Sequence, residues 1–302
     1  MSPANLPVLL TVAGPTAVGK TALCVRLARH FGTDVVSADA RQFFRELHIG
    51  TAKPTAEEMQ GVRHHFIDSH SITEDYSAGR YEADCLALLD DLFGRHRVVI
   101  LTGGSGLYLQ AVTDGLDELP PADPAVRAAL QQQLAATGLP GLLAELARLD
   151  PVSYARIDRQ NPVRVLRALE VTRSSGRPFS SFHGAARPER PFQVVKVALE
   201  RERDELYQRI DQRMDQMLQQ GLLDEVRGLL PFRHAQALQT VGYQELIGYF
   251  DGLYDYEEAV RLLKRNTRRY AKRQLTWLRR DPAYQPLHPD QAFDAIGEWL
   301  NE

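Results

Sequence analysis

Val8-Leu9-Leu10-Thr11-Val12-Ala13, followed by Gly14-Pro15-Thr16-Ala17-Val18-Gly19-Lys20-Thr21, is the stretch that decides the fold of this 302-residue chain. The last eight residues match the pattern G-x-x-x-x-G-K-[ST] between an apolar strand-like run and a helical pattern. Glycines let backbone N–H groups turn toward a phosphate, and a helix N-terminus adds partial positive charge. Lys20 supplies a point charge, and the Thr21 hydroxyl is a candidate Mg²⁺ ligand. We therefore expect all eight residues to bind a pyrophosphate-type group.

Short apolar runs alternate with helical patterns through the first hundred residues. The runs at 8–13, 34–37, 65–68 and 97–102 predict buried strands, and the patterns at 20–30 and 81–93 predict helices between them. Alternation of strand and helix predicts a parallel sheet with helices on both faces. The expected fold class is therefore α/β, with a phosphate-loop NTPase-like parallel sheet flanked by helices.

The pattern changes at a proline-rich break, 119–124. Helical patterns follow at 124–137, 139–149 and 162–174, then a Gly-, Pro- and Arg-rich connection at 176–191, and then a strand-like run at 192–199. This order predicts a helical inserted domain at 117–191 within a core formed by 1–116 and 192–302. The rest of the core is predicted to be helical at 204–230, 237–250 and 256–280.

Composition limits the location and the cofactors. The apolar runs are far shorter than the roughly 18 residues needed to span a bilayer, and the first run is too short for a secretory signal. Two cysteines, Cys24 and Cys85, make no disulfide framework, and no Cys/His cluster indicates zinc. We expect a cytoplasmic, monomeric protein with no membrane contact and no obligate protein partner.

The charge distribution indicates a local polyanion contact. The net charge is −3, yet residues 261–280 contain nine Lys or Arg and no Asp or Glu. On a helix, four of these cations lie along one face and form a basic stripe, and the segment contains no acidic residue to compensate their charge. The members of this stripe are Arg261, Arg265, Arg268 and Lys272.

Two polar residues at predicted strand ends are the candidate catalytic groups. The predicted strand at 97–102 ends in Thr-Gly-Gly-Ser105, with no carboxylate of the kind that holds Mg²⁺ in most phosphate-loop NTPases. The first acid at a strand end is Asp39. Because the carboxyl ends of parallel strands meet at one edge, Asp39 and Ser105 should lie near the phosphate loop. Asp39 suits a general base, although an N-cap role for Asp39 and a turn role for Ser105 are alternatives.

Seven segments of the chain resemble one enzyme family in the same order. They are GPTAVGKT at 14–21, SADARQFFRELHIGTAKP at 37–54, HHFID at 64–68, LTGGSGLYLQA at 101–111, NPVRVLRALEV at 161–171, QTVGYQE at 239–245 and KRQLTWLR at 272–279. The chain is similar in these segments to the tRNA dimethylallyltransferase family, and the similarity covers nearly its whole length. It departs from the family at Ala40, where Ser is common, and at Ser105, where Thr is frequent.

The resemblance implies transfer of a dimethylallyl group from dimethylallyl pyrophosphate to N6 of adenosine 37 in tRNA, with release of pyrophosphate. The phosphate loop would then grip the donor pyrophosphate, with Mg²⁺ on Thr21, and no ATP would be hydrolysed. The resemblance implies that Asp39 accepts the proton of the exocyclic amine and that Ser105 contacts the bridging oxygen of the leaving group. It places Arg213 near the pyrophosphate.

The resemblance also implies contacts with the anticodon stem-loop of tRNA, from which a stacked adenine must be flipped out to reach a buried site. The residues expected to make these contacts are Asp39, Ala40, Arg41, Gln42, Ser105, Arg127, Val163, Arg164, Val165, Leu166, Arg167, Gln239, Thr240, Val241, Gly242, Tyr243, Gln244, Lys272, Arg273, Gln274, Leu275, Thr276, Trp277, Leu278 and Arg279.

Three other functions share part of this pattern. A phosphate-loop small-molecule kinase explains the loop and Asp39, but neither the helical insertion nor the basic helix. A transferase that prenylates free adenine nucleotides needs neither of those features. A non-catalytic tRNA-binding protein would not require Asp39 and Ser105.

Overall fold

The computed structural model describes residues 6–121, 123–184 and 188–301. The chain divides into two compact units, one formed by Met1–Asp114 with Arg190–Glu302 and the other by Gly115–Glu189. The helical insertion expected at 117–191 corresponds to the second unit, and its residues 122 and 185–187 lie outside the described residues.

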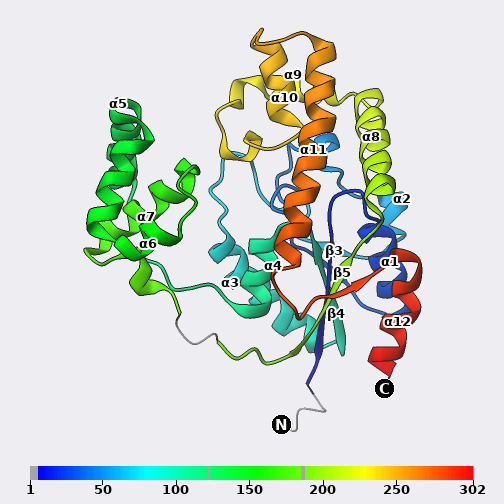
Figure 1. The fold of residues 1–302 in the computed structure, drawn as a ribbon. Helices are drawn as coiled ribbons and strands as arrows, with labels where there is room; N and C mark the ends of the chain where they lie inside the picture. The colour runs from blue at the N-terminus through cyan, green and yellow to red at the C-terminus, as the bar shows by residue number, and fades with distance from the viewer. Residues whose placement is uncertain (1–5, 122, 185–187, 302) are drawn as a thin grey trace. The chain divides into compact units, whose positions relative to one another are not determined.

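The first unit is built on a six-stranded sheet in the order β3-β2-β4-β1-β5-β6 (Figure 1). Every strand pair is parallel, and β1 lies between β4 and β5 with Val8 opposite Val98 and Gln193. Parallel neighbours need crossover connections, which the helices supply. The predicted α/β class is confirmed. The strands are β1 Val8–Ala13, β2 Val35–Ser37, β3 His64–His65, β4 Val98–Gly103, β5 Gln193–Leu199 and β6 Gln285–Leu287.

Helices cover both faces of this sheet because alternate residues of β1 point to opposite sides. Leu10 belongs to a core cluster with residues of α1, α8–α12 and neighbouring loops, whereas Leu9 belongs to a second cluster with residues of α3 and α4. All six residues of β1 are buried as a result. The helices of this unit are α1 Lys20–Phe31, α2 Ala56–Met59, α3 Ala78–Phe93, α4 Gly106–Asp114, α8 Arg203–Gln219, α9 Leu222–Leu229, α10 Tyr243–Phe250, α11 Tyr256–Leu278 and α12 Pro289–Asn301.

Two helices predicted from the sequence are shorter in the structure. The pattern at 204–230 is divided at Gly221, whose φ of 100° ends the run between α8 and α9. The pattern at 237–250 becomes a helix only after Gly242, whose φ of 102° lies outside the helical region. Positive φ is accessible to glycine at little cost, so each glycine fixes a turn that apolar periodicity alone does not reveal.

The second unit is helical, as predicted. Its helices are α5 Pro124–Leu149, α6 Pro151–Arg156 and α7 Pro162–Ser175. Gly138, with φ 68° and ψ −177°, interrupts α5 where the sequence separates two helical patterns. Leu130, Leu142 and Leu169 form part of a small core between α5 and α7. None of the helices in the part of the chain that the structure describes combines the length and apolar character needed to cross a membrane.

Candidate active site

The phosphate loop joins β1 to α1 through a series of turns, in which the N–H of Thr16 donates to the Gln274 side chain and that of Val18 donates to the Pro15 carbonyl. Ala17 and Gly19 have φ of 65° and 113°, a sequence of turns that gathers N–H groups into a cradle for an anion. No side chain caps the N-terminus of α1 at Gly19, and the first turn of α1 has no acidic residue. Gly14 is closely packed, since a Cβ there would lie 3.0 Å from Val18 Cγ1 and 3.1 Å from the Leu199 carbonyl oxygen. The loop is therefore an anion site before any ligand binds.

Cationic side chains hold the carbonyl oxygens of the same loop. Lys20 Nζ donates to the carbonyls of Gly14 and Pro15, each at 2.9 Å. Two arginines near the start of α8 donate to the next turn, Arg209 Nε to the Ala17 carbonyl and Arg201 Nε to the Val18 carbonyl, again at 2.9 Å. With its carbonyls engaged in this way, the loop is fixed with its remaining N–H groups available to a ligand.

A cavity of about 450 Å³ opens beside the loop, and its lining includes four cationic residues, Lys20, Arg41, Arg209 and Arg213. Burial lowers the pKa of Lys20 to about 8; Asp39 opposes this shift, and Arg213 adds to it. Burial also lowers the pKa of Arg213. The Arg213 guanidinium makes no hydrogen bond or ion pair with any other described residue. Burying a cation is costly, and Asp39 and Glu58 offset these two charges only in part, so a pyrophosphate in this cavity would add the missing counter-charge.

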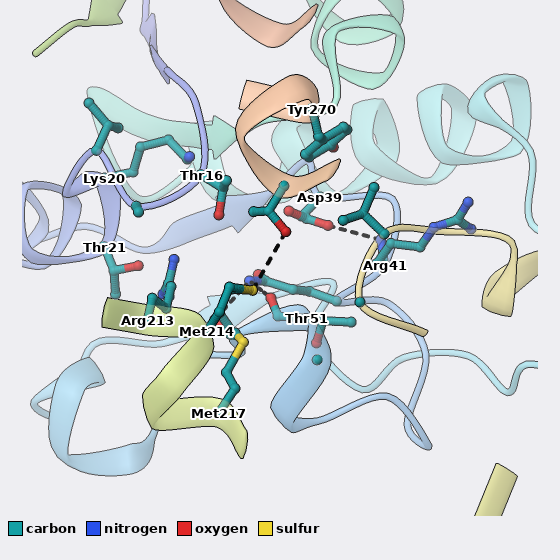
Figure 2. A pocket seen from close by; sticks show the side chains of 18 of the residues that line it. Thr16, Lys20, Thr21, Asp39, Arg41, Thr51, Arg213, Met214, Met217 and Tyr270 are labelled. Atoms are coloured by element: carbon teal, nitrogen blue, oxygen red, sulfur yellow. Dashed lines mark hydrogen bonds between the residues drawn. The ribbon is translucent and has the colours of Figure 1, made fainter. Parts of the chain in front are cut away.

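Asp39 lies across the cavity from the phosphate loop, as the strand-end argument predicts. Figure 2 shows Lys20, Thr21 and Arg213 on one side and Asp39 on the other, next to Tyr270. One carboxylate oxygen accepts the Arg41 N–H at 2.9 Å, which fixes the side chain and leaves its other oxygen without a hydrogen-bond donor among the described residues. Asp39 is therefore placed to accept a proton from a group bound in the cavity.

Ser105 is tied to the segment that carries Asp39. Its Oγ accepts the Ala40 N–H at 3.0 Å, while the side chain is not among those that line the cavity. Tyr270 lines the cavity between them; burial raises its pKa to about 12, Asp39 raises it as well, and Ser105 acts in the opposite direction. The structure thus brings Ser105 to Asp39, with Tyr270 as a neighbour that the sequence left without a role at this site.

An apolar wall completes the cavity. Met214 and Met217 follow Arg213 on α8, and Leu222 follows at the start of α9. Figure 2 shows both methionines pointing into the space between the phosphate loop and Asp39. Both methionines are buried and belong to the core cluster on this face of the sheet, so the cavity wall is continuous with the core. A flexible, polarizable wall next to a cationic cradle favours a ligand with a charged head and a short apolar group.

The loop 48–52 forms another side of the cavity and is fixed from two directions. The carboxylate of Glu225 accepts the N–H groups of His48, Ile49 and Gly50, at 3.2, 2.7 and 3.1 Å, and also the Tyr243 hydroxyl at 2.6 Å. From inside the site, the side-chain nitrogen of Gln42 donates to the carbonyls of Thr51 and Ala52, both at 3.2 Å.

This use of Gln42 corrects one expectation. Its side-chain nitrogen serves the loop 48–52, and its oxygen accepts from Ser37 Oγ at 3.3 Å. An amide used on both sides is not free to bind a base edge. Gln42 and its neighbour Arg41 both line the cavity; the Gln42 amide also supports the loop 48–52, while no hydrogen bond or ion pair of the Arg41 guanidinium is found among the described residues.

The remaining tRNA candidates of the first unit lie in the segment before α10 and at the end of α11. Gln239 and Gln244 are exposed and hydrogen-bonded to each other at 2.8 Å, and Thr240, Val241 and Gly242 line the cavity. In the α11 segment the exposed side chains are Lys272, Arg273, Thr276 and Arg279, with Leu275 and Trp277 partly buried.

Several of these candidates have buried side chains. Tyr243 is fully buried under Gly50, and Leu278 is 4% exposed in the core. Gln274 is 8% exposed and hydrogen-bonded inside the protein. Their side chains hold the segments in place.

The second unit carries the other candidates. Arg127, Val163 and Arg164 are exposed, and Val163 has 70% of its surface accessible although it is apolar. Val165 is fully buried in the core of this unit, so its side chain cannot contact tRNA. The two partly buried candidates on α7 are Leu166 and Arg167, the latter paired with Glu170 at 2.9 Å.

The basic stripe on α11 is partly neutralised, contrary to the expectation from its segment alone. Arg268 makes two bonds to the carboxylate of Asp211 on α8, at 2.5 and 2.7 Å, and Lys264 pairs with Asp215 at 2.6 Å. Arg261 pairs with Glu258 at 2.6 Å. The compensating acids lie mostly on another helix, where sequence spacing within 261–280 does not reveal them. Lys272 and Arg273 remain exposed without an ion pair among the described residues.

Fold and site together define a phosphate-loop α/β protein whose cavity suits a phosphorylated ligand with an apolar group. A family model described as IPP transferase matches residues 42–281, and the chain belongs to this family. A protein of Cytophaga hutchinsonii named tRNA dimethylallyltransferase is 53% identical over 283 residues, which cover 94% of this chain and 93% of that relative. A protein of the same name from Christiangramia forsetii is 47% identical over 297 residues, covering 97% and 98%. A crystal structure of the full-length tRNA isopentenylpyrophosphate transferase from Bacillus halodurans has a TM-score of 0.72, 38% identity, and coverage of 98% and 96%.

The lowered pKa of Lys20 predicts a pH dependence of anion binding. In the free protein Lys20 loses its proton as the pH rises through about 8, so the cavity loses a positive charge. The affinity for a pyrophosphate monoester, fully ionised throughout, should fall by up to about tenfold per pH unit above that point. Calorimetric titration at several pH values checks this. Lys20→Met should bind weakly and lose the dependence; an unchanged slope in this variant would assign the titration to another group.

Proposed function

We propose that this chain transfers a dimethylallyl group from dimethylallyl pyrophosphate to N6 of adenosine 37 in tRNA, giving N6-dimethylallyladenosine and pyrophosphate. The observation that carries the proposal is one cavity that combines the phosphate loop, an apolar wall and the Asp39 carboxylate. Relatives with 53% and 47% identity named tRNA dimethylallyltransferase support it.

The donor fits the cavity by charge and by polarity. Its pyrophosphate is assigned to the N–H cradle of the phosphate loop, with Lys20 and Arg213 as counter-charges. Its five-carbon group is assigned to the wall of Met214 and Met217. A kinase of this fold usually has a metal-binding acid after a later strand. Here β4 leads into Gly103, Gly104 and Ser105, which disfavours that alternative.

The reaction breaks the bond between the allylic carbon and the bridging oxygen and forms a bond between that carbon and N6. Positive charge develops on the allyl group and negative charge on the leaving pyrophosphate. The cradle, Lys20 and Arg213 stabilise the negative charge where it appears. Asp39 accepts the N6 proton. Ser105 is assigned to the bridging oxygen by the resemblance; its Oγ accepts the Ala40 N–H and lies beside Tyr270, so its hydroxyl would have to turn toward the cavity to reach the leaving group.

A Mg²⁺ ion is part of the proposal, with Thr21 as its protein ligand. Among the described residues no group of three or more His, Cys, Asp or Glu side chains could hold a metal ion. With the Thr21 hydroxyl at the start of α1 as its one protein ligand, the site fits an ion that takes most of its oxygen ligands from the substrate pyrophosphate and from water. When bound, Mg²⁺ would neutralise charge on the leaving group.

The acceptor is proposed to be the anticodon stem-loop, with the modified base flipped into the cavity. Asp39, Ala40 and Arg41 would meet the base, and the exposed residues of the segments 239–244 and 272–279 would meet the neighbouring backbone. The exposed Arg127 and Arg164 of the inserted unit would add further contacts. A mononucleotide acceptor needs none of these surfaces. A cytoplasmic location follows from this substrate.

A comparison of acceptors tests the function. Wild-type protein with dimethylallyl pyrophosphate and Mg²⁺ should modify a tRNA anticodon stem-loop, with no product from AMP and no donor hydrolysis without acceptor. Radiolabelled donor and mass analysis of the digested RNA measure the product. Equal turnover with AMP would favour a free-nucleotide prenyltransferase, and tRNA binding without product would favour a non-catalytic protein.

Asp39→Asn should lower turnover by about 10²- to 10⁴-fold, because an amide cannot accept the N6 proton. The amide oxygen can still accept the Arg41 N–H, so fold and tRNA affinity should persist. Single-turnover kinetics at saturating tRNA and donor measure the effect. Turnover at the wild-type rate would exclude Asp39 as the base.

Replacing Lys272 and Arg273 together with Ala should weaken tRNA binding, since both are exposed cations without an ion pair. The slope of log K against log salt should decrease in magnitude by about 0.7 to 0.9 for each phosphate that the variant no longer neutralises. Donor affinity should not change. A matched double variant, Arg26→Ala with Arg63→Ala, removes two exposed cations elsewhere that also have no ion pair among the described residues. Equal slopes for the two double variants would make the end of α11 an ordinary solvated surface.

A further inference from the structure

Gln274 of α11 joins two loops that serve different parts of the proposed reaction. Its side-chain oxygen accepts the N–H of Thr16 at 3.0 Å, and its side-chain nitrogen donates to the carbonyl of Gly104 at 2.9 Å. Thr16 belongs to the phosphate loop, and Gly104 precedes Ser105 after β4. With 8% of the residue exposed, loss of either bond would leave a buried polar group unpaired.

The backbone around Gly104 is shaped to admit this amide. A Cβ at Gly104 would lie 2.1 Å from the side-chain nitrogen of Gln274, which is closer than any real contact of that kind. One turn further along α11, the ring of Trp277 would lie 2.2 Å from a Cβ at Gly106. Both glycines therefore allow the loop after β4 to approach α11 closely.

One face of α11 forms the wall behind the reaction, and the exposed cations lie outside that wall. Thr267, Tyr270 and Gln274 line the cavity at helical spacing. Lys272 and Arg273, on the same helix, are exposed. The helix that offers cations to the acceptor also holds both loops through a single amide.

We propose that Gln274 is a positioning residue that sets the separation between the phosphate loop and the Asp39–Ser105 side of the cavity. This inference rests on the proposed function and replaces tRNA contact as the role of this residue. Carbon–nitrogen bond formation needs the allylic carbon aligned between leaving oxygen and N6, and a misplacement of about 1 Å can cost about 10²-fold in rate. Gln274 bonds directly to the phosphate loop and to the loop that leads to Ser105, and these two loops follow the paired strands β1 and β4.

Gln274→Met keeps the length of the side chain and removes both hydrogen bonds. We expect kcat at saturating donor and tRNA to fall by about 10- to 100-fold, with the dissociation constant of tRNA within about twofold of wild type. Gln219→Met is the control, because Gln219 is an exposed residue at the end of α8 outside the cavity. It should leave kcat unchanged.

Two results with Gln274→Met would overturn the inference. A raised dissociation constant for tRNA with unchanged kcat would make Gln274 a tRNA contact. A lowered melting temperature with unchanged kcat per folded molecule would make it merely structural. Wild-type protein is assayed in parallel. If the wild type itself transfers no dimethylallyl group, the proposed function fails, and that result is distinct from either result with the variant.

Gln274→Glu gives an independent test that does not need the Met variant to fold. An ionised Glu accepts from Thr16 but cannot donate to the Gly104 carbonyl, whereas a protonated Glu can do both. The ratio of its kcat to that of wild type should therefore rise as the pH is lowered from about 8 to about 6. A ratio independent of pH would contradict the role of the Gly104 bond.

Discussion

The structure depends on an inversion of backbone polarity between β1 and α1. The phosphate loop turns its N–H groups toward the cavity, and its carbonyls must therefore be satisfied on the other side. Lys20, Arg201 and Arg209 do this from within the loop and from the start of α8. The charge that stabilises a leaving pyrophosphate is thus built into the fold.

The features predicted from the sequence are those set by local pattern. Apolar runs separated by helical patterns give the parallel sheet, and the spacing of Gly14, Gly19 and Lys20 gives the loop. The position of Asp39 follows from a general rule, since carboxyl ends of parallel strands share one edge. The helix α12 was not predicted, although the spacing of Ala292, Ile296 and Leu300 is the same kind of signal.

The features that the sequence does not predict depend on which partners the folded chain brings together. The Gln42 amide bonds to the loop 48–52, only nine and ten residues away, while the Arg268 guanidinium pairs with Asp211 of α8, 57 residues away. Met214 has the same chemistry whether it faces a core or a cavity. Gln274 belongs to a motif, yet its partners Thr16 and Gly104 are 258 and 170 residues away.

The carboxylate of Glu225 has a consequence for anion selectivity. Three consecutive N–H groups at His48, Ile49 and Gly50 converge on it, an arrangement similar in kind to the phosphate loop. The protein therefore contains two backbone cradles for anions, and one is permanently filled by a charge of its own. The filled cradle neither competes for pyrophosphate nor collapses without it, so a cavity wall keeps its shape through successive cycles of binding and release.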